Sequence, residues 1–375
     1  MAQNPISISR GGKIEIKGRI KATAKNLSLL YTPGVADLVR AIEKDREKSF
    51  SHTWRGKTVA IVSDGSAVLG LGNQSPEAAM AVMEAKAMLF KELGGINAVP
   101  LVIATQDPEK IIELVKNIAP SFGGINLEDI AAPACFIVKE ALKKELEIPI
   151  FHDDQYGTAI VVLAGLINAA KVARKNLKKA KIVISGAGAA GIASAKLLTK
   201  FGVEDIIIFD SQGPLYVGRE GLNFAKQRIA QKTNPRKFKG NLKEALVGAD
   251  IFIGLSRANL LIANDVAKMN KKAIVFALAN PTPEIMPLEA QKGGAFITAT
   301  GRSDFPNQIN NVLVFPGIFK GAMETRTVAI TDEIKISAAK ALASALPKPN
   351  KNRIMLGAMD KKAVRAIAGV FKRIK

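Results

Sequence analysis

The chain has 375 residues, 48% of them hydrophobic and 23% charged, and its formal net charge is +21. This composition is typical of a globular protein with two or three domains. We find no apolar run long enough to span a membrane and no signal peptide in residues 1–10, and the single Cys135 excludes intramolecular disulfides and cysteine-rich zinc sites.

The basic charge is spread along the whole chain rather than gathered in one tail. Only three tyrosines and one tryptophan could stack on nucleic-acid bases. We therefore expect a solvated lysine-rich surface that attracts anionic small molecules, with neither a nucleic-acid nor a membrane partner, in a cytoplasmic protein.

The predicted elements alternate between strands and helices from residue 58 onward. Before that, residues 1–55 are basic and weakly patterned, apart from an alternating stretch at 13–20 that predicts a short strand. Ser75 as N-cap and Pro76 at the first position predict a helix start. The expected strands are 58–63, 99–103 and 148–151, and the expected helices are 76–93, 108–119, 133–146 and a nearly all-apolar, buried 158–173.

A second α/β unit begins at Lys181. Strand-like runs recur with helical stretches between most of them, at 181–185, 205–209, 250–254, 273–277 and 295–298. This alternation predicts a parallel, doubly wound sheet. We expect a two-domain α/β protein with an N-terminal α/β domain over 1–156, a Rossmann-type doubly wound domain over 157–332 and two basic C-terminal helices over 333–375.

A glycine-rich turn follows the strand at 181–185 and opens a helix, which is the setting a dinucleotide-binding turn requires. Gly186 would make the tight turn, Gly188 would let a pyrophosphate approach the backbone, and Gly191 would allow close packing. The amides of the intervening residues would face phosphate at a helix N-terminus; these are Ala187, Ala189 and Ala190. Asp210 ends the next strand, where a carboxylate binds ribose hydroxyls and favours NAD over NADP; a simple turn acid is the alternative.

Two acidic segments, 123–130 and 148–158, place carboxylates in apolar, glycine-bearing surroundings near strand ends. Buried acids need a cationic partner, and a divalent cation is the simplest one. Because only two histidines are present, oxygen-ligated Mg²⁺ or Mn²⁺ is favoured. The alternative is that Glu128 and Asp129 charge a helix start while Asp153 and Asp154 cap the next helix.

Lys86 shares the apolar face of its helix with Met83 and Phe90, three and four residues away. It either extends to the surface or is a desolvated amine with a lowered pKa, suited to base chemistry. Tyr31 opens a Thr-Pro-Gly turn and either presents a functional hydroxyl or anchors that turn.

Two asparagines also follow strand ends or precede turns. Asn280 and Asn311 suit carboxylate recognition, but an asparagine in a turn needs no function.

Taken together, these segments resemble the short prokaryotic-type malic enzymes. The matching segments occur in family order and cover roughly residues 25 to 340; they are Leu29–Ala36, Ser63–Asn73, Met83–Ala87, Phe122–Asp129, Phe151–Thr158 and Thr300–Asp304. Several motifs in order are far stronger evidence than any one of them.

The resemblance implies a role for each candidate residue. Tyr31 would be the general acid and Lys86 the general base. The divalent cation would be held by Glu128, Asp129 and Asp154, and malate by Lys86, Asp153, Asn280 and Asn311. Two positions depart from the family pattern, since Ala85 and Tyr156 replace a usual glycine and histidine. In addition, Ala67 stands where the large animal enzymes carry a substrate-binding arginine, and Arg302 is the candidate substitute for it.

The implied activity is metal-dependent oxidative decarboxylation of L-malate to pyruvate and CO₂ with reduction of NAD or NADP, carried out by a homodimer. Two alternatives stay open at this point. One is a malolactic or oxaloacetate-decarboxylating member of the same family. The other, from a different class, is a non-catalytic basic Rossmann protein that binds nucleic acid.

Overall fold

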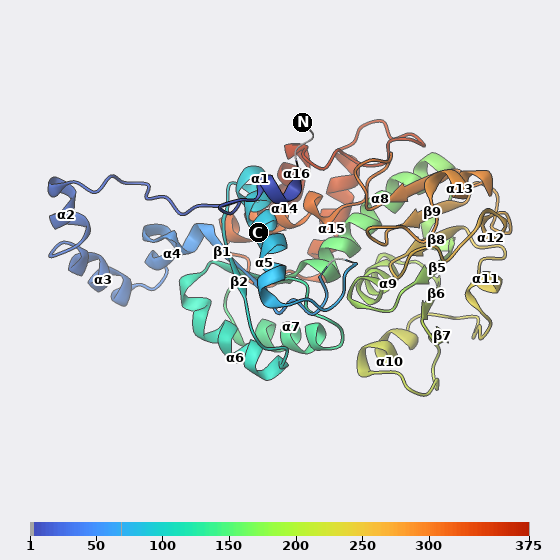
Figure 1. The fold of residues 1–375 in the computed structure, drawn as a ribbon, viewed down its shortest axis with the longest axis horizontal. Coiled ribbons are helices and arrows are strands. Elements are labelled where there is room, and N and C mark those ends of the chain that lie inside the picture. Colours follow the sequence, from blue (N-terminus) through green and yellow to red (C-terminus); the bar gives the residue numbers. More distant parts are fainter. Residues whose placement is uncertain (1–3, 69, 375) are drawn as a thin grey trace.

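The computed structural model describes residues 4–68 and 70–374. It has the predicted α/β architecture, built from two separate sheets (Figure 1). The N-terminal sheet has the strand order β2-β1-β3-β4 and is parallel throughout. Its strands are β1 (Thr58–Ser63), β2 (Asn97–Val102), β3 (Gly124–Leu127) and β4 (Ile150–His152).

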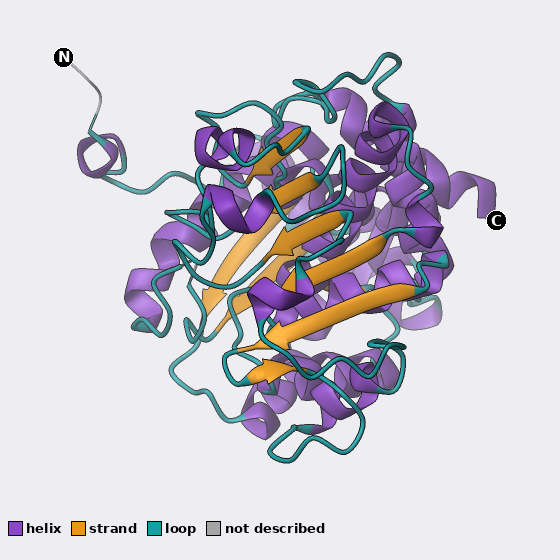
Figure 2. Cartoon of the chain, turned by 90° about the vertical axis from the view of Figure 1, so that its right-hand side faces the viewer, coloured by secondary structure: helices purple, strands orange, loops and turns teal. Residues whose placement is uncertain are grey.

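The second sheet has the order β10-β9-β8-β5-β6-β7, with all neighbours parallel except the short β7, which runs antiparallel to β6. Helices flank these strands in the view of Figure 2. Its strands are β5 (Lys181–Ser185), β6 (Asp205–Asp210), β7 (Gly213–Pro214), β8 (Ile251–Gly254), β9 (Ile274–Ala277) and β10 (Ile297–Thr300). The doubly wound sheet predicted for this half is confirmed.

Both sheets contain a point where the strand order reverses. In the first, the chain goes from β1 to β2 on one side and then crosses to β3 on the other. In the second, it goes from β5 to β6 and then crosses to β8. Ligands of open α/β sheets bind outside the carboxyl ends of strands at such points. The residues that follow β1, β3 and β5 are therefore the ones to inspect for chemistry.

Helices cover the sheets and supply most of the remaining structure. Ser75 caps α5 through its hydroxyl, which accepts a hydrogen bond from the amide of Ala78, and Pro76 is the first residue, as predicted. The helices beyond the N-terminal region are α5 (Pro76–Leu89), α6 (Pro108–Ile118), α7 (Ala134–Glu145), α8 (Thr158–Ala173), α9 (Ala189–Phe201), α10 (Phe224–Ala230), α11 (Leu242–Ala245), α12 (Ala263–Val266), α13 (Pro287–Lys292), α14 (Phe315–Thr325), α15 (Asp332–Ser344) and α16 (Lys361–Ile374). The short 3₁₀ or π segments are η1 (Trp54–Lys57), η2 (Phe90–Gly94), η3 (Ala119–Ser121), η4 (Asp153–Gly157), η5 (Leu177–Lys179) and η6 (Asn311–Leu313).

Helix α8 lies at the centre of the molecule, against α9 and α15. Together with η4 it forms one run, Asp153–Ala173, that is long and apolar enough to cross a membrane, so the expectation that no such run exists was wrong. However, 78% of its most apolar window is buried inside the protein. The run is a core helix, as its all-apolar sequence also predicts.

The N-terminal region is an arm without a core of its own. It contains α1 (Pro5–Ile8), α2 (Ala24–Leu30), α3 (Val35–Lys44) and α4 (Lys48–His52), and none of these helices has a buried residue. Helices α2 and α3 project away from both sheets (Figure 1). The strand predicted at 13–20 is wrong, because this segment is extended but pairs with no strand.

Candidate active site

Four acidic residues meet where the first sheet's strands end. Glu128 and Asp129 directly follow β3, and Asp153 and Asp154 open the single π turn η4 that follows β4. One ligand oxygen from each of Glu128, Asp129 and Asp154 lies within 4.8 Å of the other two. The structure therefore brings together the three residues predicted as metal ligands.

Lys86 reaches this acidic cluster from α5. Its side chain is buried, with 6% of the residue exposed, and its ammonium donates hydrogen bonds to Glu128 and Asp153. The same nitrogen lies 4.4 Å from the centroid of the Phe315 ring. The alternative in which Lys86 extends to the surface is thus wrong, because both the cluster and the aromatic ring hold it inside.

Burial and mutual repulsion shift the pKa values of the cluster. Burial, with Asp154 adding to it and Lys86 opposing it, raises the pKa of Glu128 to about 7. Burial raises the pKa of Asp153 to about 7 and that of Asp154 to about 6, again against the effect of Lys86. For Lys86 itself, burial lowers the pKa, but Asp153 and Glu128 outweigh it and the pKa is raised. The lowered pKa expected for a desolvated lysine is therefore wrong in the metal-free chain. One ammonium is too little charge for four neighbouring carboxylates.

The donor set fits a hard divalent cation. The cluster offers carboxylate oxygens, the ligands that Mg²⁺ and Mn²⁺ prefer. The Oδ1 of Asp153 is buried and has no hydrogen-bond partner among the described residues. A buried carboxylate oxygen left without a donor is costly, so a cation or a substrate hydroxyl at this place would lower the free energy of the folded protein.

The backbone between β3 and α7 is shaped around these acids. Asp129 adopts a left-handed conformation with φ of 52°, and its amide donates to Asp154 Oδ2 at 2.8 Å. Its carbonyl accepts from the amide of Ala67 at 2.9 Å, so the loop after β1 supports it. A non-glycine residue with positive φ is uncommon, and such conformations gather at functional sites.

Two polar residues that sequence reasoning missed support the cluster. Asn126 lies fully buried within β3 and donates to Glu128 Oε2 at 3.0 Å. Asp64 follows β1, is almost fully buried and accepts from the amide of Ser66 at 2.9 Å. The signal for Asn126 was available: it is a polar residue inside an otherwise apolar buried strand, where an amide needs a partner.

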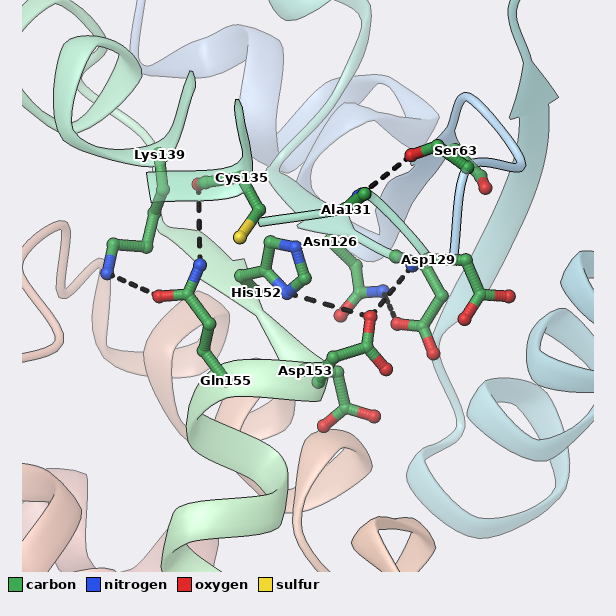
Figure 3. A network of polar contacts seen from close by, with 12 residues as sticks. Ser63, Asn126, Asp129, Ala131, Cys135, Lys139, His152, Asp153 and Gln155 are labelled. Atoms are coloured by element: carbon green, nitrogen blue, oxygen red, sulfur yellow. Dashed lines mark hydrogen bonds and ion pairs between the residues drawn. The ribbon is translucent and has the colours of Figure 1, made fainter. Parts of the chain in front are cut away.

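A polar network behind the acids fixes η4 (Figure 3). Lys139 donates to Gln155 Oε1 at 2.8 Å, and Gln155 donates to the carbonyl of Cys135 at 3.3 Å. His152 is fully buried, and its Nδ1 lies 3.7 Å from Asp154 Oδ2. Burial, together with Lys139 and Lys86, lowers the pKa of His152 to about 3, so this histidine is neutral near neutral pH.

The glycine-rich turn has the predicted geometry. Gly186 has a φ of +112°, and a Cβ there would lie 2.3 Å from the carbonyl oxygen of Leu255 after β8. A Cβ on Gly191 would lie 1.8 Å from the carbonyl oxygen of Gly186, so both positions require glycine. A Cβ on Gly188, the N-cap of α9, would meet nothing within 4 Å. This open space at a helix N-terminus fits a pyrophosphate, with the amides of Ala187, Ala189 and Ala190 beside it.

Asp210 lies at the end of β6, as expected, but its carboxylate is already engaged. Its Oδ2 accepts hydrogen bonds from Arg219 and, at 2.7 Å, from Lys226, and its Oδ1 accepts from the amide of Gln212 at 3.0 Å. Burial raises the pKa of Asp210, but the hydrogen bonds from Arg219 and Lys226 outweigh it and lower the pKa to about 2.

Tyr31 is the predicted site residue that lies apart from the acids in this chain. It caps the C-terminal end of α2 in the projecting arm and is 66% exposed. Lys86, by contrast, lies in α5, beside the first sheet (Figure 1). The chain by itself leaves Tyr31 facing solvent.

The two asparagines contact different segments near the acids. A Cβ on Gly157, the last residue of η4, would be 3.2 Å from the Cβ of Asn311, so Asn311 packs directly on the acidic turn. Asn280 is exposed just after β9, and a Cβ on Gly70 would clash with its carbonyl, which places it against the loop that follows β1. Arg302 donates to Asp304 and to the carbonyl of Pro281 at 3.0 Å.

Tyr156, one of the positions that departs from the family pattern, is buried among lysines. The Nζ atoms of Lys335 and Lys139 lie 3.7 and 4.5 Å from its ring centroid. Its hydroxyl accepts a hydrogen bond from Lys196 at 3.3 Å. The departure at this position is therefore accommodated by cation–π contacts.

Comparison with known proteins agrees with this geometry. The family model for the malic enzyme N-terminal domain matches residues 13–143, and that for the malic enzyme NAD-binding domain matches residues 155–368. The chain is 51% identical to the bifunctional malic/malolactic enzyme of Bacillus subtilis, over 95% of this chain and 88% of that one. It is 45% identical to the NADP-dependent malic enzyme of Halomonas elongata, over 94% and 83%. A crystal structure of the NAD-dependent malic enzyme of Thermotoga maritima superposes with a TM-score of 0.94 at 47% identity, covering 99% of both chains. The chain therefore belongs to the malic enzyme family.

Proposed function

We propose that the protein catalyses the divalent-metal-dependent oxidative decarboxylation of L-malate to pyruvate and CO₂, with reduction of NAD or NADP. The observation that carries this proposal is the buried Lys86, which donates hydrogen bonds to Glu128 and Asp153 beside a cluster of three carboxylates. A lysine held among metal-ligand carboxylates is placed to accept a proton from a hydroxyl bound there.

The roles of the residues follow from their positions. Asp153 and Glu128 raise the pKa of Lys86, so its amine would become neutral once a cation on the neighbouring carboxylates offsets their charge. The neutral Nζ would then take the proton of the C2 hydroxyl of malate, oriented by Asp153, which is fully buried and bonded to the same nitrogen. Glu128, Asp129 and Asp154 would hold Mg²⁺ or Mn²⁺, and the turn at Gly186–Gly191 would hold the dinucleotide. When bound, the dinucleotide accepts the hydride from C2 and the cation polarises the carbonyl that forms there.

After CO₂ leaves, C3 of the enolate needs a proton, and Tyr31 Oη is the proposed donor. This tyrosine is 66% exposed on an arm that also exposes Leu27, Leu29 and Val39. Exposed apolar side chains on a segment without a core mark an interaction surface. We infer that the protein is a homodimer in which the arm of one subunit packs on the other and brings Tyr31 to the partner's Lys86.

Mixing two inactive variants tests this arrangement. Tyr31→Phe and Lys86→Ala proteins, unfolded and refolded together, form heterodimers in which one site combines an intact tyrosine with an intact lysine. We expect about a quarter of the original activity, since half of the dimers are mixed and each has one complete site. If both residues of a site came from one subunit, the mixture would stay inactive.

Malate itself would be held by amides near the acids. Asn311 packs on η4, and Asn280 lies against the loop after β1, whose Ala67 bonds to Asp129, so both contact segments that adjoin the cluster. Arg302 is engaged with Asp304 and the carbonyl of Pro281, so a direct bond to a malate carboxylate would require it to leave these partners.

A second function is favoured by one of the comparisons, since the Bacillus subtilis relative is named as a bifunctional malic/malolactic enzyme. Product analysis separates the two. Malate with Mn²⁺ and each dinucleotide should give pyruvate and one reduced dinucleotide per CO₂; lactate without net reduction would assign the malolactic activity. A basic Rossmann protein that binds nucleic acid would show salt-dependent duplex binding and no malate turnover.

The domain boundaries and the cellular location belong to the same proposal. The first sheet and its acids support a catalytic region over 1–156, the second sheet supports the dinucleotide region over 157–332, and α15 and α16 support a helical end over 333–375. A cytoplasmic location is proposed because the single Cys135 leaves no intramolecular disulfide of the kind that oxidising compartments favour.

A further inference from the structure

The end of β6 carries more positive than negative charge. Asp210 contributes one carboxylate, whereas Arg219 and Lys226 both donate to it. The net charge of these three side chains is therefore +1. Arg219 is held further by bonds from Nη1 to the carbonyls of Gly213 and Pro214, at 2.9 and 3.0 Å, so it is fixed in place.

This position is where the adenosine half of a dinucleotide would lie. The amide of Gly186 donates to the carbonyl of Phe209 at 2.8 Å, which sets the glycine-rich turn directly beside the residue before Asp210. With a pyrophosphate at the N-terminus of α9, the adenosine ribose reaches the end of the neighbouring strand.

The carboxylate of Asp210 is poorly placed to bind a ribose diol. A carboxylate has about four lone-pair positions, and three of them already accept bonds from Arg219, Lys226 and Gln212. Its side chain is 8% exposed. A free 2′,3′-diol donates two hydrogen bonds, so it would have to displace one of these partners.

Lys226 is suited to the opposite task. Its side chain is 23% exposed, and among the described residues one of its three N–H donors is used, on Asp210. A 2′-phosphate brings acceptors and about two negative charges, which a site of net positive charge attracts and a free carboxylate would repel.

We propose that the end of β6 recognises the 2′-phosphate of NADP, with Lys226 as its ligand and Asp210 as the residue that positions Lys226 and Arg219. This inference rests on the proposed function in one respect only, that the glycine-rich turn binds a dinucleotide. It reverses the preference for NAD that the acid at position 210 suggests from sequence alone.

Calorimetric titration of the full chain with 5′-AMP and with 2′,5′-ADP tests the proposal without any turnover. We expect 2′,5′-ADP to bind at least about tenfold more tightly, since charge-assisted hydrogen bonds are the strong ones, and we expect salt to reduce this difference. Lys226→Gln should remove the preference and change 5′-AMP binding little. Lys232 is an exposed lysine just beyond α10, so Lys232→Gln is the matched control and should keep the preference for 2′,5′-ADP.

Asp210→Asn separates the two roles of the acid. If Asp210 positions Lys226 and Arg219 for a phosphate, the variant keeps its 5′-AMP affinity while its preference for 2′,5′-ADP becomes smaller; if Asp210 binds the ribose hydroxyls, 5′-AMP affinity falls. Thermal unfolding of each variant reports whether it is folded. Equal affinity of the unmodified protein for both nucleotides, or loss of 5′-AMP binding in Asp210→Asn, would overturn the proposal while leaving the dinucleotide site intact. Absence of binding by either nucleotide would instead refute the dinucleotide site on which the proposed function depends.

Discussion

Both sheets place acids at the carboxyl ends of parallel strands and give them opposite electrostatic surroundings. At the first reversal point, four carboxylates surround Lys86, and burial raises the pKa values of Glu128 and Asp153 to about 7. Beside the second, Asp210 stands between two cations, and its pKa is lowered to about 2. The first group has more negative than positive side chains, and the second has more positive than negative ones.

The difference shows that an acid after a strand does not by itself identify its ligand. The number of counter-charges within hydrogen-bond distance decides whether the place attracts a cation or an anion. The four predictions below would break or sharpen this contrast, from the largest expected effect to the smallest.

Lys86→Ala should lower the rate of malate oxidation by a factor of about 10² to 10⁴, the usual contribution of a general base, while dinucleotide binding stays intact. Steady-state rates and dinucleotide titration measure the two effects. Lys91→Ala, on η2 and hydrogen-bonded only to Asn97 among the described contacts, is the matched control. Substantial turnover in Lys86→Ala would rule out its role as the base.

Asp154→Asn should weaken the stabilisation of the protein by Mn²⁺, because one charged ligand is lost. The Mn²⁺ concentration that gives half of the maximal stabilisation should rise by at least about tenfold. Thermal unfolding at increasing Mn²⁺ measures this. Asp107→Asn is a suitable control, since Asp107 caps α6 and asparagine caps a helix equally well. Equal Mn²⁺ responses in both variants would exclude Asp154 from the site.

The stabilisation by Mn²⁺ should grow as the pH rises from about 5.5 to 8. Glu128 and Asp153 have pKa values of about 7 and Asp154 of about 6, so protons compete with the cation at lower pH. These folded-state pKa values lie above the ordinary values of 4.5 for Glu and 3.8 for Asp, so the metal-free protein binds extra protons when folded. The free energy of unfolding of the metal-free protein should therefore fall as the pH rises from about 4 to 7. The unfolding curves measured with and without Mn²⁺ should move apart over the same range. Parallel curves would contradict the cluster's shifted titration.

Asp210 should show the opposite and smaller pH effect. Its folded pKa of about 2 lies below the ordinary 3.8, so its contribution to stability is complete above about pH 4 and is lost as the pH falls toward 2. Between pH 4.5 and 3, Asp210→Asn should lose less stability than the unmodified protein in denaturant titrations. An identical loss would mean that the bonds from Arg219 and Lys226 do not stabilise the charged form.

Much of the fold follows from local patterns. Strands β1 and β5 and helix α8 have their predicted limits, because apolar runs bounded by caps and glycines determine them locally. Strand β3 was not assigned, since Asn126 and the glycines at its start break the apolar pattern that marks a buried strand. The extended segment at 13–20 has the alternation of a strand, but no neighbouring strand pairs with it.

The site was predictable where motifs place side chains at strand ends, as for Glu128, Asp154 and the glycine-rich turn. It was not predictable where a role depends on residues distant in sequence. The pairing of Lys86 with Asp153 spans 67 positions, and the hydrogen bond between Asp210 and Lys226 depends on how a loop returns to β6. Neither contact has a local signature.

Asp154 lies at a junction, because it follows β4 of the first sheet by two residues and belongs to η4, which continues without a break into α8. Glu128 and Asp129 are attached to the end of β3 in the same sheet. A shift of α8 against the first sheet would therefore change the spacing of the three oxygens that now lie within 4.8 Å of one another. A cation bound there would tie the start of the central helix to the end of β3, so metal binding would also stiffen the junction between the two sheets.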